Sequence, residues 1–282
     1  MNATVFVAVI GAAILHAGWN IAIKGGHDKE MNLAAVVLGH VPLALVALAF
    51  VPIPAIECFP YLVGGIFLHF FYQLFLLVSY QKGDLTQVYP IARGSAPLAV
   101  LLFSFLVLGM EIDLVETLGI FIVGSGIISF ALVRGADGLY NRNATFFAVV
   151  TGLCIASYSI LDGLGARISS TPLGYYSWLA IGNGILILVY FSFKSPQTLF
   201  KVAKKGKRVF LLGGAASFLA YCIVIWAFTK APIPLVMALR ETSIVFALVA
   251  GVFCLRERFE LLKVLSTFVT LIGVVILRYP KL

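Results

Sequence analysis

Charged residues are scarce in this chain. Only 11% of its 282 residues are charged and 61% are hydrophobic, whereas about a quarter of the residues in a soluble domain are charged. A packed core of this length cannot bury so much apolar surface, so we predict that lipid surrounds the protein in place of water. The four cysteines have no paired spacing, which argues against a disulfide framework or a structural zinc site.

Signatures of hydrolytic and cofactor-dependent chemistry are also missing. The sequence has no Walker A glycine loop, no nucleophile elbow and no HExxH zinc pair, so we expect no ATP hydrolysis, no metal and no cofactor. A membrane-embedded enzyme would need clustered acid–base residues, and a channel would need a continuous polar lining; both are distant alternatives. The net charge of +8 does not indicate nucleic acid, because the basic residues lie in short loops between apolar runs.

The chain does contain a series of apolar runs, each close to the length of about 20 residues that crosses a bilayer as a helix. We therefore predict an all-α integral membrane protein with ten transmembrane helices. The predicted spans are residues 4–23, 32–51, 60–80, 86–108, 114–133, 145–166, 173–193, 209–229, 234–254 and 260–278.

The two halves of the chain resemble each other at an offset of roughly 140 to 147 residues, which indicates an internal repeat. Arg93, for example, matches Arg240. We expect two five-helix repeats, residues 1–138 and 139–282. Because five is an odd number, the second repeat enters the membrane from the opposite side. Such an inverted repeat is typical of secondary transporters, with a binding site near the midplane.

With these features the chain resembles the EamA-type carriers of the drug/metabolite transporter superfamily. The local marks are the segment Gly83–Pro90 after the third span, and Glu111 and Glu257 after the fourth and ninth spans. The resemblance covers essentially the whole chain. It implies that spans 1, 3, 4, 6, 8 and 9 line a central cavity and that spans 5 and 10 pack at the periphery. Carriers of this kind move many classes of small metabolite, so the substrate stays open.

The distribution of basic residues predicts the orientation in the membrane. Of the 20 Lys and Arg residues, Arg93 and Arg240 lie within spans, four lie in loops on the side of the termini, and fourteen lie on the opposite side. Since Lys and Arg accumulate in the cytoplasm, both termini are predicted outside a cell inner (plasma) membrane. The resemblance implies termini inside. The strongest orienting element is the basic loop at residues 194–208.

Two arginines within the predicted spans are the sharpest candidates for substrate binding. Arg93 and Arg240 should each lie roughly 10–12 Å deep, so that they flank the midplane and bind one anionic group through the guanidinium fork. The alternative is that each pairs with a carboxylate or with backbone carbonyls. Glu241 is a local partner for Arg240, although adjacent residues do not face each other on a helix.

Other polar and aromatic residues fall on the helix faces that we expect to meet this site. Asp162, in the sixth span, has two interpretations: it carries a proton, or it lies near the end of its helix in water, which is the reading we favour. The predicted substrate-binding residues are His16, Trp19, Asn20, Tyr72, Gln73, Tyr89, Arg93, Tyr158, Tyr221, Arg240 and Glu241.

These patterns predict a secondary active transporter of a small organic metabolite, and not an enzyme. We expect an amino acid or a similar zwitterion or anion, with phosphonate-type or phosphorylated metabolites as the alternative. An inverted repeat permits transport in both directions, and export is our expectation. The expected partners are the substrate, the lipid bilayer and protons as the coupling ion; monomer and homodimer are both open.

The predicted orientation can be tested by thiol labelling. A Lys204→Cys variant, with the four native cysteines replaced by alanine, should resist a membrane-impermeant maleimide added to intact cells, because the basic segment is retained inside. The same variant should react once the cells are permeabilised, which controls for accessibility. Rapid labelling of intact cells would reverse the assignment of every loop.

Overall fold

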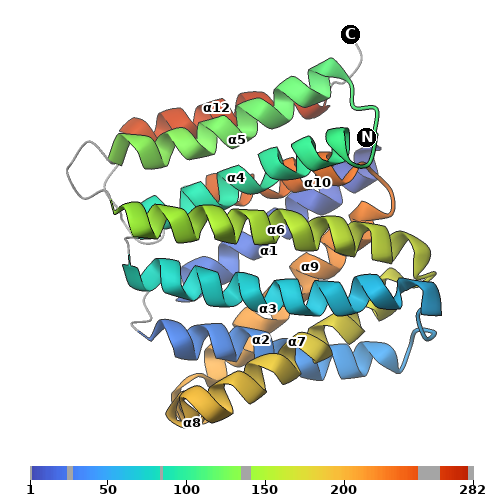
Figure 1. Ribbon diagram of the computed structural model, residues 1–282, viewed down its shortest axis with the longest axis vertical. Helices are drawn as coiled ribbons and strands as arrows, with labels where there is room; N and C mark the ends of the chain where they lie inside the picture. Colours follow the sequence, from blue (N-terminus) through green and yellow to red (C-terminus); the bar gives the residue numbers. More distant parts are fainter. Residues whose placement is uncertain (1, 24–27, 83–84, 135–140, 247–260, 279–282) are drawn as a thin grey trace.

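The structure is a computed structural model that describes residues 2–23, 28–82, 85–134, 141–246 and 261–278. These ranges are helical, with short connections and no strand among them. The long helices run across the view in Figure 1 and stack side by side, with α5 and α12 at one end of the stack and α2, α7 and α8 at the other.

The helices agree closely with the predicted spans except in two places. They are α1 (Ala3–Ile23), α2 (Lys29–Leu48), the 3-10 turn η1 (Ile56–Cys58), α3 (Phe59–Lys82), α4 (Leu85–Leu106), α5 (Leu114–Arg134), α6 (Arg142–Ile168), α7 (Pro172–Lys194), α8 (Pro196–Lys205), the π turn η3 (Val209–Gly213), α9 (Gly214–Phe228), α10 (Ile233–Arg240) and α12 (Leu261–Arg278).

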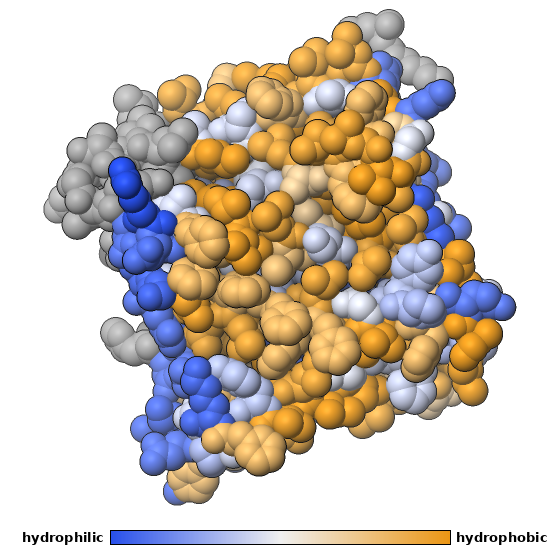
Figure 2. Space-filling view, viewed as in Figure 1, coloured by the Kyte–Doolittle hydropathy of each residue, from blue (hydrophilic) through white to orange (hydrophobic). Residues whose placement is uncertain are grey.

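The lipid-facing character of the molecule is visible on its surface. Five helical segments in the described part of the chain are long and apolar enough to cross a bilayer: Lys29–Leu48, Ile56–Lys82, Arg142–Ile168, Pro172–Lys194 and Val209–Phe228. Shorter apolar helices accompany them. Figure 2 shows a broad hydrophobic band between hydrophilic margins at the two ends of the helices. Large side chains such as Phe121, Leu219 and Phe268 are more than half exposed, as expected when lipid is the solvent.

The ninth predicted span, residues 234–254, is interrupted. α10 ends at Arg240, and the backbone N–H groups of Glu241 and Thr242 donate to carbonyls three residues back, at 3.2 and 3.1 Å. Thr242 also donates its hydroxyl to the Leu239 carbonyl oxygen at 2.7 Å. Hydroxyl side chains that bond the local backbone compete with helical pairing, and the helix tightens here into a turn. Residues 247–254 lie outside the described part of the chain.

The prediction of a loop at residues 194–208 is wrong in its local structure, because residues 196–205 form helix α8. Pro196 occupies the first turn, where its missing N–H costs nothing. Thr198 and Val202 are buried, whereas Phe200 is 60% exposed and carries the Lys204 ammonium 4.4 Å above its ring. An apolar side with a lysine-rich margin is typical of a helix that lies in the membrane interface.

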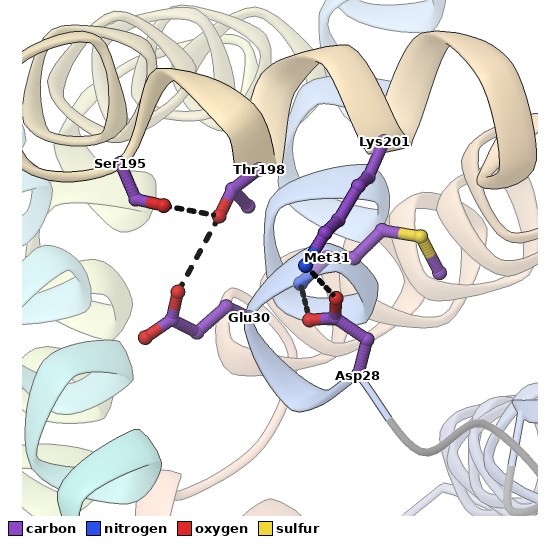
Figure 3. Close-up of polar contacts among 6 residues, drawn as sticks. All are labelled: Asp28, Glu30, Met31, Ser195, Thr198 and Lys201. Atoms are coloured by element: carbon purple, nitrogen blue, oxygen red, sulfur yellow. Dashed lines mark hydrogen bonds and ion pairs between the residues drawn. The ribbon is translucent and has the colours of Figure 1, made fainter.

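Polar contacts join the two halves of the chain at the α8 end of the bundle. Lys201 of α8 bonds the Asp28 carboxylate at 2.7 Å, and Thr198 donates to Glu30 at 3.4 Å (Figure 3). Asp28 also caps α2 by accepting from the Met31 N–H at 3.0 Å. The hydrogen bond from Lys201 lowers the pKa of Asp28, although partial burial opposes the shift. The carboxylate is therefore charged at neutral pH.

The opposite end of the bundle is held differently. Arg167, in the last turn of α6, donates from Nε to the carbonyl oxygen of Phe228 at 2.9 Å and from Nη2 to that of Ala231 at 3.0 Å. The guanidinium therefore satisfies carbonyls that the end of α9 leaves without helical partners. This contact also joins the two predicted halves, through the connection between α9 and α10.

Glycine pairs allow several helices to pack with their backbones in contact. A Cβ atom on Gly214 would lie 2.8 Å from the Gly39 Cα atom, and one on Gly39 would collide with the Phe210 carbonyl oxygen. Gly94 and Gly124 bring α4 against α5 in the same manner. Small residues at such crossings are the usual basis of helix packing in membranes.

The crossing of α2 with the start of α9 should therefore be sensitive to a single methyl group. Gly39→Ala should destabilise the protein by about 1–3 kcal/mol, because the backbones must separate to admit the Cβ atom. Gly11→Ala is a matched control, since nothing lies within 4 Å of a Cβ atom at that helical position. Thermal unfolding of the purified variants in detergent measures the difference, and equal melting temperatures would contradict the close crossing.

Candidate functional site

The candidate site begins with Arg93, which lies in α4 between two prolines. Pro90 and Pro97 are both inside this helix. Pro97 has no N–H, so the Arg93 carbonyl lacks its usual helical partner. The Arg93 side chain is 7% exposed, and the helix passes close to α5 at Gly94. The side chain is thus directed to the interior of the bundle.

A single carboxylate bridges the two predicted arginines. Arg93 Nε lies 2.7 Å from Glu241 Oε2, and Arg240 Nε lies 3.8 Å from Glu241 Oε1. Glu241 is fully buried and Arg240 is 5% exposed on its side chain. The argument that adjacent residues cannot face each other is wrong here, because α10 ends at Arg240 and Glu241 lies in the following turn. Both arginines therefore have the carboxylate neighbour that the alternative interpretation expected.

The cluster has more positive than negative charge. Two guanidinium groups share one carboxylate, and Arg240 Nε and Nη2 form no hydrogen bond with any residue that the structure describes. Arg240 also interacts with Tyr158 and lies 5.8 Å from the centre of the Tyr221 ring. His16 of α1 interacts electrostatically with both arginines. Buried charge of one sign without full compensation is costly, so an anion is the natural ligand.

A second polar cluster surrounds Asp162, and the expectation that this residue lies in water is wrong. Asp162 is fully buried in α6, with Oδ2 at 2.8 Å from His69 Nε2 of α3. Tyr221 of α9 donates to the same oxygen at 2.6 Å, and Tyr175 of α7 donates to Oδ1 at 3.5 Å. Gly65 of α3 provides the space, because a Cβ atom there would lie 2.8 Å from Asp162 Oδ1. Asp162 is therefore buried although it lies close to the end of its helix.

Aromatic rings connect the two clusters. Tyr158 stacks on the His69 ring with 3.9 Å between centroids and lies 6.1 Å from Tyr221. Tyr221 is bonded to Asp162 through its hydroxyl and faces Arg240 with its ring. Tyr72 and Tyr176 extend the wall at 5.4 Å from Tyr158 and 5.0 Å from Tyr221. Such walls suit the apolar part of a small ligand.

The structure brings together most of the predicted site residues whose side chains it describes. Gln73 is buried one turn after His69, but no described contact connects it with either cluster. The side chains of Trp19, Asn20 and Tyr89 lie outside the described part of the chain, as do Gly83, Asp84 and Glu257. The site prediction omitted His69, Asp162, Tyr175 and Tyr176. The available signal was helical spacing, since His69 precedes Tyr72 by three residues and Asp162 follows Tyr158 by four.

Comparison with known proteins relates the second half of the chain to a family of transporters. The model of the EamA-like transporter family matches residues 142–279. The match covers most of the second half of the chain. The resemblance predicted from the sequence is thereby confirmed for residues 142–279, and the family match indicates a multi-pass membrane protein that transports small molecules.

The overall fold has a counterpart among solved structures. One of them, described as "Crystal structure of protein", aligns with this EamA-like chain with a TM-score of 0.77 over 100% of both chains at 14% identity. At this identity the likeness shows the fold alone. No curated protein matches the sequence.

The bridging role of Glu241 predicts a strong effect of its neutralisation. Glu241→Gln should reduce stability by about 3–5 kcal/mol, because it leaves two buried guanidinium groups without a counter-charge. The exposed Glu111→Gln variant is the matched control. Melting temperature and detergent-soluble yield provide the measurement. A second variant, Glu241→Gln with Arg240→Gln, should recover part of the loss; full stability of the single variant would show that the bridge is not charged.

Proposed function

We propose that this EamA-like protein is a secondary active carrier whose substrate is a small organic acid or amino acid. The acid group would bind at the Arg93–Glu241–Arg240 cluster. The observation that carries the proposal is the excess of one positive charge in this buried cluster, at the point where α10 ends. A monoanionic group balances that excess.

The type of acid group follows from the same charge balance. A carboxylate adds one negative charge and can accept the parallel N–H groups of a guanidinium. A phosphonate or phosphate can add up to two, which would leave the cluster overcompensated. The charge count therefore favours amino acids and other carboxylates over phosphorylated metabolites. The tyrosine walls around Tyr158 and Tyr221 suit an apolar side chain or the face of an ammonium group.

The packing pattern supports the proposed arrangement of two inverted repeats, residues 1–138 and 139–282. α3 packs against α6 and α7, and its counterpart α9 packs against α1 and α2. α2 pairs with α7 and α5 pairs with α12, so these helices would face their own counterparts. Arg93 and Arg240, which occupy matching positions, meet at Glu241. In inverted-repeat carriers the site lies at this interface, and one repeat rocks against the other.

The proposed orientation places α8 in the cytoplasm. Its lysines and the adjoining Lys207 and Arg208 form one of the hydrophilic margins of the molecule, and its exposed Phe200 would enter the interface. Both termini would then lie outside the plasma (inner) membrane. Export of the substrate is the proposed direction, and protons are the proposed coupling ion.

The proposal is tested by transport in proteoliposomes. Counterflow of radiolabelled amino acids and small carboxylic acids should occur with wild type, and Arg93→Lys should reduce it at least about tenfold, since Lys keeps the charge but loses the fork. Arg142→Lys, at an exposed position of α6, is the matched control and should transport normally. Each active compound should also raise the melting temperature of wild type.

Two outcomes would contradict the proposal. Counterflow of phosphorylated compounds alone would replace the carboxylate by the phosphonate class. Equal thermal stabilisation of wild type and Arg93→Ala by a transported compound would remove Arg93 from the binding site.

A further inference from the structure

Asp162 and His69 form a buried pair that the substrate cluster does not use directly. The pair is held by four helices: Asp162 belongs to α6, His69 to α3, Tyr175 to α7 and Tyr221 to α9. Asp162 is fully buried and His69 is 8% exposed. An ionised carboxylate accepts hydrogen bonds only, so His69 Nε2 and the two tyrosine hydroxyls must donate to it. With Asp162 ionised, the neutral His69 ring carries its proton on Nε2, and the lone pair of Nδ1 can bind a further proton.

We propose that the His69–Asp162 pair is a proton-binding site whose occupancy is coupled electrostatically to the binding of an acid group at Arg93 and Arg240. The inference rests on the proposed function, and it assigns the coupling ion to named residues. The proton adds to the lone pair of His69 Nδ1 and forms one N–H bond. No other bond changes, and the proton comes from solvent and returns to it.

Charge balance supplies the coupling. In the empty protein, the two arginines, Glu241 and Asp162 carry two positive and two negative charges when His69 is neutral. An acid group at the arginines adds one negative charge. A proton on His69 adds one positive charge and restores the balance. Because uncompensated charge is costly in a buried site, an anionic cargo and one proton should each favour the binding of the other.

The contact between the clusters makes this coupling short-ranged. Tyr221 donates its hydroxyl to Asp162 at 2.6 Å, and its ring lies 5.8 Å from the Arg240 guanidinium carbon. Tyr158 interacts with Arg240 and stacks on His69 at 3.9 Å. Charges that are separated by one aromatic side chain in a partly desolvated interior interact more strongly than they would in water. A change of charge at either cluster therefore changes the electrostatic potential at the other.

Other titratable groups around the pair do not compete for the same proton. His16 faces two guanidinium groups, which oppose a further positive charge. His40 of α2 contacts the rings of Tyr176 and Phe218 and has no carboxylate beside it among the described residues. Among the described residues, the titratable and charged groups that interact with the pair or its immediate partners are His40, Cys58, Arg93, Tyr158, Tyr175, Tyr176, Tyr221, Cys222 and Arg240.

The proposal can be tested without a cargo, by nitrogen NMR of the full-length protein labelled on histidine. His69→Gln identifies the His69 signals. Asp162→Asn removes the negative partner and should lower the proton affinity of His69 at least about tenfold, equal to one pH unit. Tyr221→Phe retains the ring volume and should raise that affinity. Without the Tyr221 hydroxyl, Asp162 loses one hydrogen bond to its negative charge and interacts more strongly with a protonated His69.

Charge changes at the arginine cluster test the coupling, and they predict opposite shifts. Arg240→Gln removes one positive charge and so imitates the effect of a bound acid group on the cluster. It should raise the proton affinity of His69 about tenfold or more. Glu241→Gln adds one positive charge to the cluster and should lower that affinity. Arg142→Gln at an exposed site is the matched control and should leave the titration unchanged.

The outcomes separate this inference from the proposed function. A His69 signal that does not titrate, or that titrates identically in wild type, Asp162→Asn and Arg240→Gln, overturns the proton site even if counterflow succeeds. The predicted opposite shifts establish the coupled site even if no compound in the transport panel is carried.

Discussion

The bridge from Glu241 to Arg93 and Arg240 is the interaction on which the centre of this bundle depends. It joins α4 of the first half to the end of α10 in the second, and it is the means by which two guanidinium groups are tolerated at a depth where water is scarce. The bridge forms where α10 ends, since Arg240 is the last residue of the helix and Glu241 lies in the turn that follows. The interrupted helix and the ion bridge therefore belong together. Interrupted helices recur at binding sites of secondary carriers for the same reason.

A polar network of this kind affects neighbouring side chains as well as charges. Tyr158 and Tyr221 contact both the arginine cluster and the His69–Asp162 pair. Their rings fill space that aliphatic side chains would fill in a purely structural core, and the Tyr221 hydroxyl donates a hydrogen bond to Asp162. Fully satisfied buried networks specify one arrangement of the helices. At Arg93 and Arg240, where one carboxylate only partly balances two positive charges, the network favours the binding of an anionic ligand instead.

The sequence was sufficient for the helices but not for the partners of their polar residues. Apolar runs of spanning length predicted nearly all helix bounds, because the bilayer dictates both length and composition. Arg93 and Arg240 were identifiable because charge at membrane depth is rare. The bridge through Glu241 was misjudged, since the break after Arg240 depends on local hydroxyl–backbone bonding in competition with helix formation. Asp162 was misplaced because its burial arises from Gly65 on another helix, a contact that has no signal along the chain.

The polar contacts between helices differ in exposure and strength at the two ends of the bundle. At the α8 end, the Lys201–Asp28 contact lies largely at the surface, where an ion pair contributes little and weakens as ionic strength rises. At the other end, Arg167 inserts between two backbone carbonyls that move only when α9 and α10 move. Rising ionic strength would therefore weaken the contact between α8 and the start of α2 while leaving the Arg167 contacts largely unchanged.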